Sequence, residues 1–140
     1  MAVKKMTETE FKKGDSLVGY LYNVNLKRYV TEHSGRELSM KSESTPDAVQ
    51  FRVKYLGDGK GVWLTAHDAT LSFSWKAGPS YRCILKGKGE PIKFVAWDGF
   101  GFKIMAMSDS TYVGTLPNWG QYDPYVVKGT MNQRFEFHLV

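Results

Sequence analysis

The sequence repeats a short pattern three times at a spacing of about forty residues, and this limits the architecture more than any other feature. A glycine followed by an apolar strand opens each unit, at residues 19–25, 61–67 and 101–107. A second apolar strand comes about thirty residues later, at residues 51–53, 94–97 and 135–137. A fixed period of this kind indicates a repeat architecture. Because short strands stacked in a line would leave sheet edges exposed, we expect three lobes that close around an axis.

The length indicates one domain. A chain of 140 residues can bury about two thirds of the surface that its unfolded form exposes, so it needs no disulfide or metal ion to hold a core. Its single cysteine, Cys83, is expected to be a buried core residue. Residues 1–14 are polar and charged, so we expect a flexible N-terminal lead-in, with Phe11 as its candidate contact to a domain spanning residues 15–140. The expected lobes are residues 17–59, 60–98 and 99–140.

From Leu17 onward, apolar and polar residues alternate with a period of two, which is typical of half-buried strands. Twelve short strands are predicted, separated by clusters rich in glycine, proline, serine and aspartate. No capped helical stripe of ten residues or more stands out. The pattern predicts an all-β fold in which two sets of apolar residues are equivalent and buried. These sets are Tyr22, Leu64 and Ile104, and Phe51, Phe94 and Phe135.

Three units of this length, each ending in an apolar strand with Phe or Trp, resemble a β-trefoil. The resemblance covers residues 17–140 and implies a β-trefoil of three four-stranded lobes with pseudo-threefold symmetry. Among trefoils, the chain is similar to the ricin B-type lectin superfamily. Trefoils also include protease inhibitors, actin-bundling domains and cytokine-like signals, so the fold alone does not determine the function.

The sequence contains none of the common enzyme signatures. It lacks a glycine-rich phosphate loop, a nucleophile elbow and a His-Glu-x-x-His motif. The three histidines, His33, His67 and His138, lie one in each expected lobe without metal-ligand spacing. We therefore expect a protein that is not an enzyme, with no catalytic residues, no cofactor and no bound metal.

The resemblance to ricin B-type lectins points to sugar-binding residues in the third lobe. Lobes of those lectins end in Gln-x-Trp, often preceded by Asn, and residues 132–135 (Asn-Gln-Arg-Phe) match with Phe in place of Trp. The resemblance implies that Asn132 and Gln133 contribute to a sugar site. An equally open alternative is that the pair only ties the barrel together. The lectins also carry an Asp on the first hairpin, and its positions here are Asn23, Thr65 and Met105, of which Asn23 is a secondary candidate.

A second candidate is the aromatic loop at residues 116–125. Here Trp119 and Tyr122 could stack on a sugar face, while Asn118 and Asp123 hold its hydroxyl groups. The same composition would suit a protein interface, or a loop that closes the barrel with its own aromatic rings. All three interpretations remain open on the sequence.

The net charge of +5 and the pI near 9.3 come from dispersed lysines, so we expect a basic surface and no specific nucleic-acid site. No run is long and apolar enough to span a membrane. The expected partner is a glycan or glycoprotein, with a protein partner as the alternative. The compartment stays open: secreted if a signal peptide was removed, and otherwise cytoplasmic.

Overall fold

The computed structural model describes residues 3–14, 16–32, 36–66, 72–75, 83–87, 91–107, 110–114, 127–129 and 133–140. Within these ranges one α-helix, α1 (Glu8–Lys12), and a 3-10 turn, η2 (Thr45–Asp47), accompany a single twelve-stranded sheet. The prediction of an all-β protein is therefore confirmed. The strands are β1 (Leu17–Asn23), β2 (Arg28–Glu32), β3 (Leu38–Ser42), β4 (Gln50–Gly57), β5 (Lys60–Thr65), β6 (Ser72–Trp75), β7 (Cys83–Lys86), β8 (Ile92–Asp98), β9 (Gly101–Ala106), β10 (Tyr112–Gly114), β11 (Val127–Gly129) and β12 (Phe135–Leu139).

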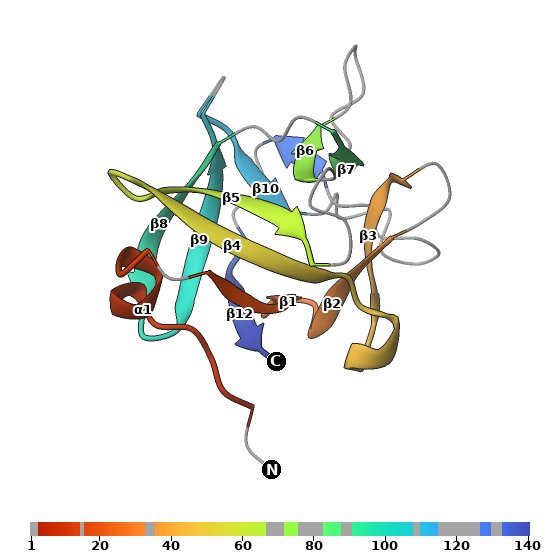
Figure 1. Cartoon of the computed structure of the whole chain (residues 1–140). Coiled ribbons are helices and arrows are strands. Elements are labelled where there is room, and N and C mark those ends of the chain that lie inside the picture. The colour runs from red at the N-terminus through yellow and green to blue at the C-terminus, as the bar shows by residue number, and fades with distance from the viewer. Residues whose placement is uncertain are drawn as a thin grey trace.

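Six of these strands close into an antiparallel barrel. Strand β1 pairs with β4, β4 with β5, β5 with β8, β8 with β9, β9 with β12, and β12 again with β1. Closure of the ring gives each barrel strand a partner on both sides, which removes the exposed edges that short strands would otherwise present. Three hairpins, β2–β3, β6–β7 and β10–β11, continue from β1, β5 and β9 (Figure 1).

The barrel pairings show which positions are equivalent in the three units. Gly19 pairs with Phe51, Gly61 with Ile92, and Phe102 with Phe135. The residues two positions after Gly19, Gly61 and Phe102 are fully buried, and their side chains fill the barrel. They are Leu21, Trp63 and Ile104.

This register corrects the expected alignment by one residue. Tyr22 is only half-buried, because its neighbour Leu21 occupies the inward position that the sequence pattern assigned to Tyr22. The cause is the turn before the third unit. In that turn Asp98 pairs with Gly101, so β9 begins at Gly101 itself. In the turn before the second unit Gly57 pairs with Lys60, so β5 begins one residue before Gly61.

The three phenylalanines expected in the core are all buried, as predicted, although they are not all equivalent. Phe51 and Phe135 occupy the paired position described above, and Ile92 occupies it in the second unit. Phe94 lies two residues further along β8. Cys83 is also fully buried, as the sequence predicted.

The N-terminal segment differs from the expected flexible lead-in. Met6 and Phe11 are buried in the core, and the Met6 amide donates a hydrogen bond of 2.9 Å to the Phe137 carbonyl. Helix α1 begins with a capping box between Thr7 and Glu10, and in Figure 1 it packs beside the barrel. Residues 3–14 are thus part of the domain. The expected contact by Phe11 is confirmed, and Met6 adds a second buried side chain that the sequence analysis did not predict.

In the part of the chain that the structure describes, no helix has the length and apolar character needed to cross a membrane.

Candidate functional site

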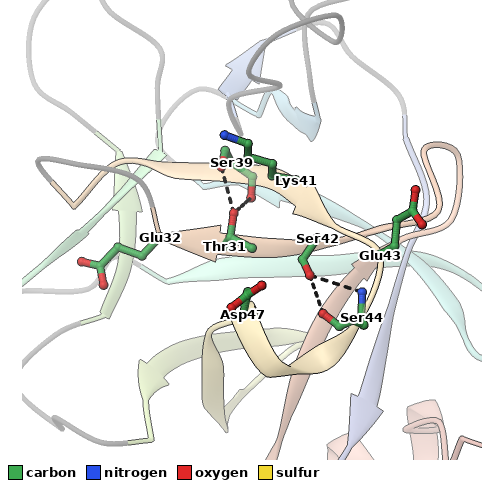
Figure 2. A pocket seen from close by; sticks show the side chains of 8 residues that line it. All are labelled: Thr31, Glu32, Ser39, Lys41, Ser42, Glu43, Ser44 and Asp47. Carbon is green, nitrogen blue, oxygen red and sulfur yellow. Dashed lines mark hydrogen bonds between the residues drawn. The ribbon is translucent and has the colours of Figure 1, made fainter.

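A polar pocket lies against the hairpin β2–β3 and the turn η2. Its volume is about 620 Å³, within the range of about 300–1,000 Å³ that small-molecule sites occupy. Every described side chain that lines it carries a hydroxyl, carboxylate or ammonium group (Figure 2). The lining residues are Thr31, Glu32, Ser39, Lys41, Ser42, Glu43, Ser44 and Asp47.

The floor of this polar pocket is a cross-strand pair of hydroxyl groups. Thr31 on β2 pairs directly with Ser39 on β3, and their side-chain oxygens lie 2.9 Å apart in a buried contact. At the rim, the Ser42 hydroxyl accepts a hydrogen bond of 3.2 Å from the Ser44 amide, which turns the chain into η2. These bonds hold the walls in place before any ligand arrives, so ligand binding would need little ordering of the pocket.

The polar pocket is acidic although the chain as a whole is basic. Among the described lining residues, three carboxylates stand against one ammonium group, that of Lys41. Figure 2 shows Glu32 and Glu43 at opposite ends, with Asp47 between them on η2. Glu43 forms an ion pair of 2.9 Å with Arg28, while all three carboxylates belong to exposed residues. Carboxylate oxygens only accept hydrogen bonds, so the pocket suits a neutral ligand rich in hydroxyl donors and disfavours an anionic one.

A second pocket, the aromatic groove, has a volume of about 580 Å³ and lies where the barrel strands β1 and β12 meet the N-terminal segment. Tyr22 and Phe100 supply aromatic surface, and Tyr22 stacks on the ring of His138 at a centroid distance of 4.6 Å. Polar groups stand among these rings. The lining residues are Val3, Lys5, Tyr22, Tyr29, Glu43, Phe100, Glu136 and His138.

The polar groups of the aromatic groove form one chain of hydrogen bonds. The Tyr29 hydroxyl lies 2.7 Å from His138 Nδ1, and His138 Nε2 lies 2.9 Å from Glu136 Oε1. Lys5 Nζ then donates to the other oxygen of Glu136 at 3.3 Å. Because a carboxylate can only accept, neutral His138 carries its proton on Nε2, and Nδ1 accepts from Tyr29.

Burial alters the ionisation of this chain. Desolvation lowers the pKa of His138 below its ordinary value, and the hydrogen bond and negative charge of Glu136 oppose this shift only in part. Desolvation also raises the pKa of Tyr29, which keeps its hydroxyl protonated. At neutral pH this series of hydrogen bonds therefore contains a protonated Tyr29 phenol and a neutral His138 imidazole.

This arrangement predicts a pH dependence of stability. The unfolded chain protonates His138 near pH 6.5, whereas the folded chain resists the proton until a lower pH, so the unfolded state binds more protons in between. We expect the free energy of unfolding to fall as the pH drops below about 6.5. Tyr22, Tyr29 and Glu136 contact the imidazole, and Lys5 is paired with Glu136.

The measurement is chemical denaturation at a series of pH values, with a His138→Gln variant as the comparison. The two proteins share every other residue, so the difference between the two slopes reports on His138. A smaller slope for the variant below pH 6.5 supports the assignment. Parallel profiles would contradict it.

Two of the residues predicted from the sequence are brought together by the fold. Asn23, on β1, donates from Nδ2 to Gln133 Oε1 over 2.8 Å, and its Oδ1 accepts from the Leu26 amide at 3.0 Å. Asn23 is also fully buried. Arg134, the residue after Gln133, donates a hydrogen bond from its backbone amide to Asn25 Oδ1 at 2.8 Å. These contacts attach Gln133 and the start of β12 to β1 and to the turn after it, so Gln133 holds strands of the barrel together.

The remaining predicted site residues, Asn118, Trp119, Tyr122, Asp123 and Asn132, lie outside the residues that the structure describes. The hypothesis of a sugar site in the aromatic loop therefore stays a prediction.

Sequence reasoning missed both pockets. The polar pocket draws on residues 42–47, whose serine, threonine, proline and aspartate content predicted only a loop. The available signal was a set of polar side chains on β2 and β3: Thr31, Ser39 and Lys41 line the pocket together with this loop. The aromatic groove gave no local signal, because its described residues come from six separate segments of the chain.

Among the described residues, no group of three or more His, Cys, Asp or Glu side chains could hold a metal ion.

Comparison with known proteins identifies the fold. The structure is similar to that of ThreeFoil, a designed threefold-symmetric protein, with a TM-score of 0.74 and 14% sequence identity. The match covers 86% of this chain and 97% of that chain. The chain therefore has a β-trefoil fold, as its sequence predicted. No protein-family model matches the sequence, and no curated protein matches it.

Proposed function

We propose that the chain is a non-enzymatic carbohydrate-binding module, similar in kind to the ricin B-type lectins. The observation that carries the proposal is the polar pocket on β2–β3 and η2, which presents hydroxyl and carboxylate groups on a framework held by its own hydrogen bonds. Sugars offer many hydroxyl donors, and hydrogen bonds to charged acceptors contribute about 1.5–3 kcal/mol each.

The proposal extends to the organisation of the fold. We propose three four-stranded lobes related by pseudo-threefold symmetry. The pairings of Gly19, Gly61 and Phe102 support this, because they recur at corresponding places around the barrel. The polar pocket then belongs to the first lobe, and the aromatic loop at residues 116–125 is a second candidate site in the third lobe.

The test is binding of the full chain to an array of neutral, sialylated and sulfated glycans in the presence of a calcium chelator. We expect neutral glycans to bind and anionic glycans to bind more weakly, because the lining carboxylates repel negative charge. The expected effect of Asp47→Asn is a loss of about tenfold or more in affinity for a neutral glycan, since one charge-assisted hydrogen bond becomes a neutral one.

Asp58→Asn is the matched control, because Asp58 is an exposed carboxylate that lines neither pocket. If both variants bind like the parent protein while Trp119→Ala does not, the site lies in the aromatic loop instead. An array on which no glycan binds would reject the carbohydrate proposal. A stable complex in a pull-down with a purified candidate protein would then favour the alternative, a protein-interaction module or protease inhibitor that uses trefoil loops.

A further inference from the structure

The two pockets meet at one residue. Glu43 follows β3 and lines both the polar pocket and the aromatic groove. Its side chain is held by the ion pair of 2.9 Å with Arg28 at the start of β2. Figure 2 shows Glu43 at the end of the polar pocket that is furthest from Glu32. The two cavities are therefore neighbours, and a single ligand that passes Glu43 would enter both.

The two pockets also differ in the chemistry that they offer. The polar pocket provides hydroxyl and carboxylate groups, and none of the described residues that line it is aromatic. The aromatic groove provides rings: Tyr22 is half-buried, and Phe100 is 44% exposed on the turn between β8 and β9. Sites for small ligands combine apolar surface with a few placed polar groups. The described residues of the polar pocket supply no ring surface, and the aromatic groove beside it supplies that surface.

From this juxtaposition we infer that the aromatic groove is a second subsite for the same ligand, and that this ligand is an extended neutral oligosaccharide. The inference rests on the proposed carbohydrate-binding function and names its ligand class. One end of the oligosaccharide lies in the polar pocket, where its hydroxyl groups donate hydrogen bonds to Glu32 and Asp47. The oligosaccharide then passes Glu43, and a later sugar unit places its apolar face against Phe100 and Tyr22.

The charged groups in the aromatic groove are compatible with an uncharged oligosaccharide. Lys5 is already paired with Glu136, at 3.3 Å, and lies over the Phe100 ring at 5.8 Å from its centroid. Glu136 Oε1 accepts from His138, whose imidazole is neutral because burial lowers its pKa. The charged groups of the groove thus compensate one another within the protein, and a ligand without charge leaves these pairs intact.

The experiment measures affinity as a function of ligand length by isothermal titration calorimetry. The probes are neutral galactose-, mannose- and N-acetylglucosamine-based chains of one to six sugar units. We expect the affinity of the series that binds to rise by about tenfold or more between the disaccharide and the longer chains. Phe100→Ala should remove this gain and leave the disaccharide affinity unchanged, because the short ligand occupies the polar pocket alone.

Leu56→Ala is the matched control, since Leu56 is 48% exposed and lines neither pocket. It should keep the full dependence on length. If short chains bind as tightly as long ones, or if Phe100→Ala weakens every length equally or none, the second subsite is refuted while carbohydrate binding stands. If no chain of any length binds, both proposals fail.

Discussion

Replacing Phe11 with alanine is expected to lower the free energy of unfolding by about 3–5 kcal/mol. The side chain is 1% exposed, stacks on Phe94 at a centroid distance of 4.3 Å, and meets the edge of Tyr55 at 4.9 Å. Removal of the ring leaves a cavity between α1 and the barrel that the rigid strands cannot close. Deletion of residues 1–14 should destabilise the domain at least as much, because it also removes the buried Met6 side chain and the hydrogen bond from the Met6 amide to the Phe137 carbonyl.

Thr9→Ala is the matched control for Phe11. Thr9 lies on the same short helix with an exposed side chain, so its replacement should change stability by no more than about 0.5 kcal/mol. Urea denaturation of the parent protein, Phe11→Ala and Thr9→Ala measures the change in the free energy of unfolding. If Phe11→Ala unfolds at the same urea concentration as the parent, the N-terminal segment is dispensable, as its polar composition alone suggested.

Gly19→Ala is expected to destabilise the barrel by about 1–3 kcal/mol or more, although it adds a single methyl group. A Cβ at Gly19 would overlap the backbone carbonyl oxygen of His138 and lie 2.9 Å from the ring of Phe137. Both belong to β12, which pairs with β1 along its length. Backbone in a paired strand cannot move aside without breaking ladder hydrogen bonds, so the strain stays in the barrel.

Gly101 provides the comparison, because it occurs in the same sequence pattern and meets a different obstacle. A Cβ there would approach the side chain of Arg134 at 2.7 Å, and a flexible side chain can move away. We expect Gly101→Ala to cost clearly less than Gly19→Ala in thermal and urea unfolding. Equal costs would show that the close approach of β1 to β12 does not limit the residue at position 19.

The site was far harder to predict than the fold. Thr31, Ser39 and Asp47 are ordinary residues for an exposed hairpin and turn, and only their convergence makes a pocket. Asn23 and Gln133 were each proposed as sugar ligands. They are 110 residues apart in the chain, so their direct hydrogen bond could not be predicted from local patterns.

The alternation of apolar and polar residues, together with the threefold spacing, was sufficient to predict an all-β chain, and the resemblance of the three units to a β-trefoil predicted the fold. Alternation specifies which face of a strand is buried, because side chains point to opposite faces with a period of two. It does not specify which residues of distant strands pair. The one-residue shift that places Leu21 rather than Tyr22 in the barrel arose from a turn.

The tertiary structure alone decided the role of the N-terminal segment and the positions of the two pockets. Met6 and Phe11 stand among charged residues, and their burial depends on a surface that only the closed barrel presents. The aromatic groove likewise gathers Lys5, Tyr22 and His138 from opposite ends of the chain. Packing between distant segments is set by the complementary shapes of folded elements, which no local pattern of residue types encodes.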